Sequence, residues 1–144
     1  MAMFNPSREQ VRAFFSEAWR KHRSREVLTP LETMAADWVL QHPEYHEVLQ
    51  DPDAAGLDYT VEQGRTNPFL HLSMHLAISE QLQIDQPPGI RALHQQLLAT
   101  HDPHQAAHEI MECLGEVVWE AQRLGTAFSN EGYLELIKRR VSRR

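Results

Sequence analysis

The sequence predicts an all-α fold, a single antiparallel bundle of helices with short accessory helices. Three observations predict it: polar residues followed by proline at regular points, apolar residues at three- and four-residue steps, and short connections between these segments. A chain of 144 residues that is 42% hydrophobic is large enough for one well-buried core. We therefore predict one domain over residues 1–144, with residues 138–144 as a basic tail.

Four helix starts share one pattern, an N-cap residue followed directly by proline. Proline suits the first helical position because its missing N–H has no partner there and its fixed φ matches the helix. Thr29 also begins a capping box, because Glu32 is placed to accept a hydrogen bond from its backbone. The four pairs are Asn5-Pro6, Thr29-Pro30, Asn67-Pro68 and Asp102-Pro103.

Seven helices follow from these starts and from the apolar periodicity. Gly125 ends the longest helix at a position that favours a left-handed residue. We expect one apolar face on this longest helix, reaching from Ala107 through Val118 to Ala121, and we expect Trp19, Trp38 and Trp119 in the core. Segment 68–85 is apolar almost all round, so it is predicted to be the central helix. The predicted helices cover 6–22, 30–41, 43–49, 68–85, 90–100, 103–124 and 130–141, with a loop at 57–66.

Charge is distributed unevenly along the chain. The net charge is −6, yet residues 8–25 carry six Lys or Arg against two Glu, and residues 138–144 carry five basic side chains. We favour surface ion pairs between these basic ends and the acidic middle. Association of the basic C-terminus with nucleic acid is a third-ranked hypothesis, which the overall negative charge disfavours.

The cellular compartment predicted from the sequence is the cytoplasm. The N-terminus has charges at once and no apolar signal region, and no stretch approaches the ~18 apolar residues of a membrane span. The single cysteine, Cys113, permits no internal disulfide, and we expect it to be buried or half-buried.

Two histidine pairs at helical spacing are the strongest chemical signal. Residues four apart stack on one helix face about 5–6 Å apart, so each pair can offer two imidazoles to one ion. His71 and His75 lie on the predicted central helix, and His104 and His108 begin a ladder on the longest helix that continues to Glu112.

These residues predict a metal site between the two helices. Imidazole and carboxylate together suit Zn, Fe, Ni or Mn, and bundles build metal sites from facing helices. The HExxH motif and the paired Glu-x-x-His motifs of di-iron bundles are absent, so the sequence does not decide whether the chain is an enzyme. The predicted ligands are His71, His75, His104, His108 and Glu112.

A non-enzymatic alternative remains open. The histidines would then form a buried polar network in a helical module that binds another protein, or a second copy of the chain, through an exposed apolar groove or through the basic ends. No particular partner follows from the sequence.

Two segments carry a resemblance to a known family. NPFLHLSMHLAISEQLQIDQPPGI and HDPHQAAHEIMECLGEVVWEAQR resemble a bacterial family catalogued as domain of unknown function 1841, over most of the chain. The resemblance implies a compact bacterial protein and no particular activity.

Overall fold

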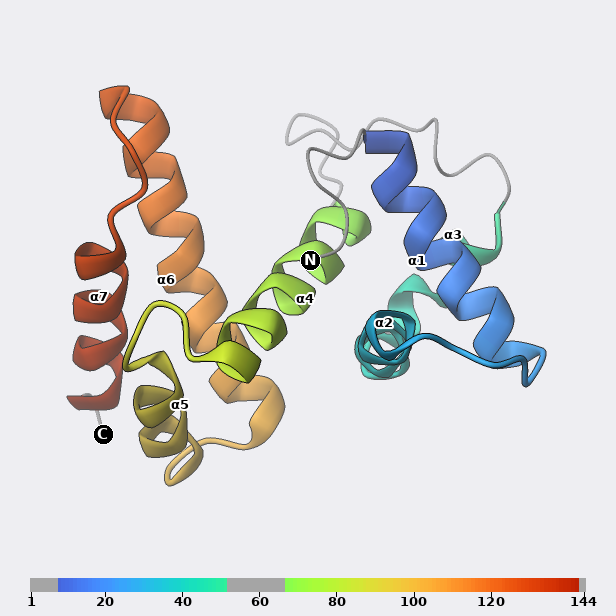
Figure 1. Cartoon of the computed structure of the whole chain (residues 1–144), viewed down its shortest axis with the longest axis horizontal. Coiled ribbons are helices and arrows are strands. Elements are labelled where there is room, and N and C mark those ends of the chain that lie inside the picture. The colour runs from blue at the N-terminus through green and yellow to red at the C-terminus, as the bar shows by residue number, and fades with distance from the viewer. Residues whose placement is uncertain (1–7, 52–66, 143–144) are drawn as a thin grey trace. The chain divides into compact units, whose positions relative to one another are not determined.

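The computed structural model describes residues 8–51 and 67–142, and these form helices and no strand. The all-α prediction is therefore confirmed. The helices are α1 (Arg8–Arg23), α2 (Pro30–Leu40), the 3₁₀ turn η1 (Pro43–Tyr45), α3 (His46–Gln50), α4 (Pro68–Ile84), α5 (Ile90–Leu98), α6 (Pro103–Leu124) and α7 (Asn130–Ser142), as Figure 1 shows.

Residue contacts divide the chain into two compact units. The first unit ends at Ala77 and the second begins at Ile78, so that α4 contributes its first part to one and its remainder to the other. The prediction of one domain stays a prediction. The part of the chain that the structure describes contains no helix long and apolar enough to cross a membrane.

In the first unit, α1 packs against α2 and α3 around a shared apolar core. The core also takes side chains from the start of α4, and the guanidinium of buried Arg12 lies 5.1 Å from the centre of the Phe69 ring. On α1 the buried residues Phe15, Ala18 and Trp19 follow the three- and four-residue steps of an amphipathic helix. The buried core residues are Phe15, Ala18, Trp19, Ala35, Val39, Leu49, Phe69, Leu72 and Leu76.

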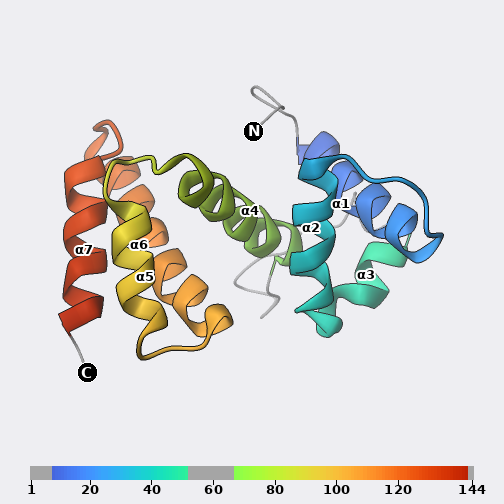
Figure 2. The same cartoon turned by 60° about the horizontal axis from the view of Figure 1, so that its bottom comes forward.

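In the second unit, α5, α6 and α7 pack against one another, as Figures 1 and 2 both show. Tyr133 of α7 is buried and donates a hydrogen bond from its hydroxyl to Oε1 of Gln81 (2.7 Å). Arg91 donates to the carbonyl oxygens of Leu82 and Gln83, which are acceptors left over at the end of α4. Cys113 is buried, as predicted, and burial raises the pKa of its thiol to about 11.

The helix starts follow the capping chemistry that the sequence predicts. The Thr29 hydroxyl accepts from the Glu32 amide (3.1 Å), and the Glu32 carboxylate accepts from the Thr29 amide (2.9 Å). Asn67 accepts from the amide of Leu70, and Gly125 ends α6 with a φ of 66°. The start predicted at Pro6 and the loop predicted at 57–66 lie outside the described residues.

Replacing Asp102 with alanine is expected to lower the free energy of unfolding by about 1 kcal/mol, within the 0.5–2 kcal/mol typical of N-caps. The Asp102 carboxylate accepts a hydrogen bond from the Gln105 amide (2.8 Å), which would otherwise have no partner at the start of α6. Urea unfolding followed by circular dichroism measures the change. Asp102→Asn is the control, since asparagine caps equally well, and a loss equal to that of alanine would contradict the capping role.

Two predictions about the C-terminal half of α6 are wrong. Val118 and Trp119 were expected inward, but they are 38% and 61% exposed, and the Arg123 guanidinium lies over the Trp119 ring. Helix length explains the error. The 22 residues of α6 span about 33 Å, whereas the 13 residues of α7 and the 9 of α5 span only about 20 and 14 Å, so its end lies beyond both.

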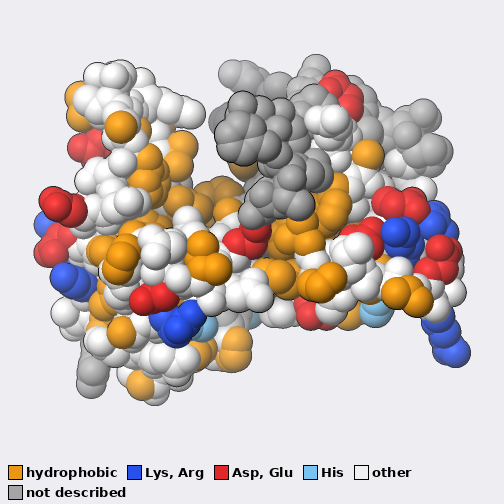
Figure 3. All heavy atoms as spheres, in the orientation of Figure 1, with side chains coloured by type: hydrophobic (Ala, Val, Ile, Leu, Met, Phe, Trp, Pro, Cys, Tyr) orange, Lys and Arg blue, Asp and Glu red, His pale blue; other side chains and the backbone are white. Residues whose placement is uncertain are grey.

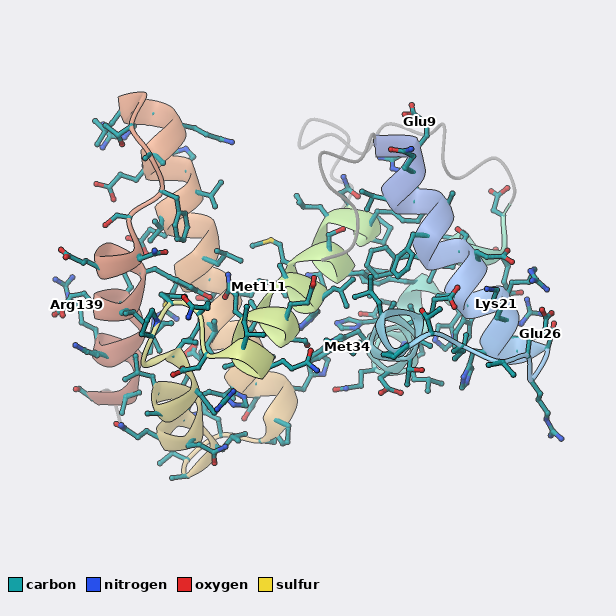
Figure 4. All side chains as sticks on the ribbon, viewed as in Figure 1. Glu9, Lys21, Glu26, Met34, Met111 and Arg139 are labelled. Carbon is teal, nitrogen blue, oxygen red and sulfur yellow. The ribbon has the colours of Figure 1, made fainter. Side chains whose placement is uncertain are left out.

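Two basic side chains of the N-terminal segment form ion pairs, and two of their three acidic partners, Glu26 and Glu32, belong to the acidic middle. Arg20 pairs with Glu17 and Glu26 at 2.6 Å each, and Lys21 pairs with Glu32 at 3.0 Å. Figure 3 shows basic and acidic side chains interspersed over this end of α1, where Figure 4 labels Lys21 and Glu26. Binding of nucleic acid by the C-terminus stays a prediction.

Candidate metal centre

Three histidines of the first unit bring their Nε2 atoms together. Nε2 of His71 lies 3.2 Å from Nε2 of His42 and 3.1 Å from Nε2 of His75. One ring nitrogen from each of the three lies within 4.8 Å of the others. His42 and His75 are buried and His71 is half-buried, so these nitrogens meet in surroundings largely removed from water.

Two local structures position these rings. His71 and His75 are four residues apart on α4, and their ring centres are 4.8 Å apart, as their spacing predicts. His42 follows the end of α2, where Pro43 and the turn η1 stop that helix. The prediction that segment 43–49 forms one short helix is correct only in outline, since it divides into η1 and α3.

Trp38 contacts two of the three histidines. Its backbone carbonyl oxygen accepts a hydrogen bond from Nδ1 of His42 (2.7 Å). A carbonyl oxygen has no proton to give, so the contact assigns the proton of the neutral His42 ring to Nδ1 and leaves a lone pair on Nε2. The indole of Trp38 stacks on the His75 ring, with centres 3.9 Å apart and planes inclined by 15°. Trp38 thereby fixes both the tautomer of one ring and the orientation of another.

Tyr45 forms a second aromatic wall. Its ring is nearly parallel to that of His42, with centres 5.4 Å apart, and meets the His71 ring edge-on at 5.8 Å. Burial raises the pKa of the Tyr45 phenol, and the Glu44 carboxylate adds to the rise. The phenol is therefore protonated at neutral pH and brings no charge to the histidines.

The three nitrogens form an arrangement that protons alone satisfy poorly. An imidazole nitrogen has one in-plane position, which holds either a proton or a lone pair. Nε2 of His71 faces two other nitrogens, and a single proton on it can form only one straight N–H···N hydrogen bond. A metal ion, by contrast, accepts a lone pair from each nitrogen.

The separations agree with ligation. Two nitrogens bound to a tetrahedral zinc ion at about 2.0–2.1 Å lie about 3.3–3.4 Å apart. The observed 3.1 and 3.2 Å differ from that value by a few tenths of an ångström. These two separations are close to those that a bound zinc ion requires.

Another histidine of the same unit provides a contrast. Nε2 of His46 donates to the carbonyl oxygen of Val39 (2.8 Å), and the ring packs on Trp19 with centres 4.4 Å apart. His22 stacks on the same indole. These contacts are typical of histidines that serve packing, because both rings lie against one tryptophan and a ring nitrogen of His46 is bound to a backbone carbonyl.

The remaining predicted ligands lie on α6 in the second unit. The rings of His104 and His108 are neighbours, with centres 4.3 Å apart, as their spacing predicts. Glu112 is exposed and accepts a hydrogen bond from Arg140 (3.0 Å), which also pairs with Glu109. Their participation in a metal site stays a prediction.

His42 is the residue that sequence reasoning missed. It lies four residues after Trp38 and seven after Ala35, so it continues the inward stripe of α2 by one more position. A histidine on that stripe, directly before a proline, was the available signal. His42 was not predicted as a ligand because it lies between the two segments predicted as helices, 30–41 and 43–49.

The fold and the converging imidazoles define a class, that of all-helical proteins with a histidine cluster able to hold a metal ion. Within it, the chain belongs to the family described as domain of unknown function DUF1841, whose model matches residues 7–139. The match confirms the resemblance noted in the sequence. Comparison with curated proteins and with solved structures gives no match.

Proposed function

We propose that the protein binds one divalent transition-metal ion through Nε2 of His42, His71 and His75. The observation that carries the proposal is the position of His71 Nε2, which lies between two other ring nitrogens at 3.1 and 3.2 Å. Burial supports it, because His42 and His75 have little access to water, which would otherwise compete for their lone pairs.

The ligand chemistry indicates which ions to test. Neutral imidazole suits zinc, copper, nickel and iron, whereas magnesium and calcium prefer oxygen ligands. The hydrogen bond from His42 Nδ1 to a carbonyl oxygen is the outer contact that ligating histidines commonly make, and it raises the basicity of the ligating nitrogen.

The test is a titration of the full-length, tag-free chain after chelator treatment, with zinc(II) in competition with a chromophoric chelator and cobalt(II) followed by its visible absorption. We expect saturation at one ion per chain and a cobalt spectrum typical of nitrogen ligation. Magnesium serves as the control ion and is expected not to compete. Absence of zinc and cobalt binding at concentrations equal to that of the protein would overturn the proposal.

Replacing Trp38 with leucine is expected to weaken zinc binding by about 10- to 100-fold, the range typical of groups that orient metal ligands. The substitution removes the ring that stacks on His75 but keeps the backbone carbonyl that accepts from His42, so it isolates the effect of the indole. The competition titration measures the change.

Trp38→Phe is the matched control, because a phenyl ring can still stack on the imidazole, and it is expected to retain most of the affinity. An equal loss in the leucine and phenylalanine variants would contradict a role of ring stacking in positioning His75.

A further inference from the structure

A groove lies along α6 and α7 within the second unit. Its volume is about 460 Å³, and it is open to solvent along one side. Its α6 wall extends from Glu116 to Leu124, about 12 Å or two helical turns. A groove of this length between two helices matches the contact that one additional helix makes when it packs beside a pair.

The floor of the groove is apolar. Val117, Ala121 and Leu124 follow one another at steps of four and three residues on α6, and Leu136 faces them from α7. Ala121 and Gly132 are the smallest residues of α6 and α7 that line the groove. Leu124 is 54% exposed, so part of the apolar surface is in contact with water. Burying such a row against apolar side chains is favourable.

The rim of the groove is acidic. Glu116 and Glu120 are four residues apart on α6, and Glu135 lies on the α7 wall. Within residues 8–51 and 67–142, neither Glu116 nor Glu120 forms an ion pair, whereas the preceding acid of the same ladder, Glu112, is paired with Arg140. Two like charges at this spacing destabilise a helix slightly.

The basic side chain that lines the groove already lies near a carboxylate. Arg139, which projects outward from α7 in Figure 4, lies 3.9 Å from the Glu135 carboxylate, and both side chains are more than half exposed. The acidic side chains of α6 are therefore left without a compensating charge within the groove, and a cationic ligand would supply one.

We propose that this groove binds a basic amphipathic helix of a partner protein. The helix would place apolar side chains at i, i+3 or i+4, and i+7 against Val117, Ala121 and Leu124, and lysine or arginine beside Glu116 and Glu120. The complementarity of an apolar floor and an acidic rim favours this partner over an acidic or purely apolar one. The proposal is independent of the metal site.

The test uses fluorescence anisotropy with a labelled synthetic peptide of about 14 residues, roughly four helical turns. The probe has leucine on one helical face and lysine on its flanks, and a scrambled peptide of the same composition controls for charge. We expect the amphipathic probe to bind more tightly than the scrambled one, and its affinity to fall as salt rises. Equal affinities for the two peptides would overturn the proposal.

Two variants locate the binding. Ala121→Trp fills the groove and is expected to remove binding of the probe, with helicity checked by circular dichroism. The double variant Glu116→Gln/Glu120→Gln is expected to weaken binding about 2- to 10-fold, as for two surface ion pairs. Glu44→Gln/Glu47→Gln makes the same charge change in the first unit and is expected to leave the affinity within twofold of the wild type.

Other outcomes contradict the proposal. Probe binding that survives Ala121→Trp would place the peptide elsewhere on the acidic surface. If gel filtration shows that the protein associates with itself and Ala121→Trp prevents it, the occupant is a second copy of the chain and not a basic partner.

Discussion

Replacing His71 with alanine is expected to weaken zinc binding by more than about 100-fold. His71 Nε2 is the central nitrogen of the cluster, within 3.2 Å of Nε2 of His42 and within 3.1 Å of Nε2 of His75. Loss of even an outer partner of a metal ligand commonly costs 10- to 100-fold in affinity, and loss of a ligand costs more. Competition with a chromophoric chelator measures the difference.

The thermal stability of the same variant gives an independent measurement. An ion that binds only the folded state stabilises it by RT ln(1 + [L]/Kd), about 2.7 kcal/mol at a hundredfold excess over Kd. Zinc is therefore expected to raise the unfolding temperature of the wild type and to leave that of His71→Ala nearly unchanged. Equal shifts in the two proteins would contradict ligation by His71.

Further histidine variants complete the experiment. His101→Ala removes one imidazole from the segment between α5 and α6, where Nδ1 donates to the Leu97 carbonyl, and it is expected to bind zinc like the wild type. His108→Ala tests the sequence-based prediction that the second histidine pair contributes a ligand. A loss of affinity there would support that prediction, and wild-type affinity would count against it.

Replacing Leu72 with alanine is expected to lower the free energy of unfolding by about 2–5 kcal/mol. Leu72 is 0% exposed and belongs to the core that α1, α2 and α4 share in the first unit. Truncation of a fully buried leucine loses the transfer free energy of its methyl groups and leaves a cavity. Urea unfolding is measured by tryptophan fluorescence, in which Trp19 and Trp38 report on the same unit, and Trp119→Phe removes the signal of the exposed tryptophan on α6.

A neighbouring residue provides the matched control. Leu70 is on the same helix but is 58% exposed, so Leu70→Ala is expected to change the free energy of unfolding by no more than about 0.5 kcal/mol. If the two variants lost the same free energy, the burial assigned to Leu72 would not determine its contribution.

Helix positions were predictable because their signals are local. The bounds of α6 agree with the prediction at both residues, since Asp102 and Pro103 define its start and Gly125 its end. Each of these effects involves residues within one helical turn. The exposure of Val118 and Trp119 was not predictable in this way, because it depends on how far α7 and α5 extend along α6.

The candidate site was predicted in part for the same reason. The approach of His71 to His75 follows from their separation along α4. The approach of His42 to His71 joins residues 29 apart in the chain, and it depends on the packing that brings the end of α2 to α4. No periodicity within a single helix specifies such a contact.

The sequence by itself determined the fold class, most helix boundaries and one pair of metal-ligand candidates. Backbone capping, proline geometry and helical periodicity act over a few residues, and these are sufficient for such features. Only the tertiary structure decided that His42 joins His71 and His75, that Glu112 pairs with Arg140 and that an acidic groove lies beside α7. These features arise where separate helices are packed together by burial of apolar surface. Because the hydrophobic effect is not directional, it does not specify the particular contacts, which depend on how the whole fold packs.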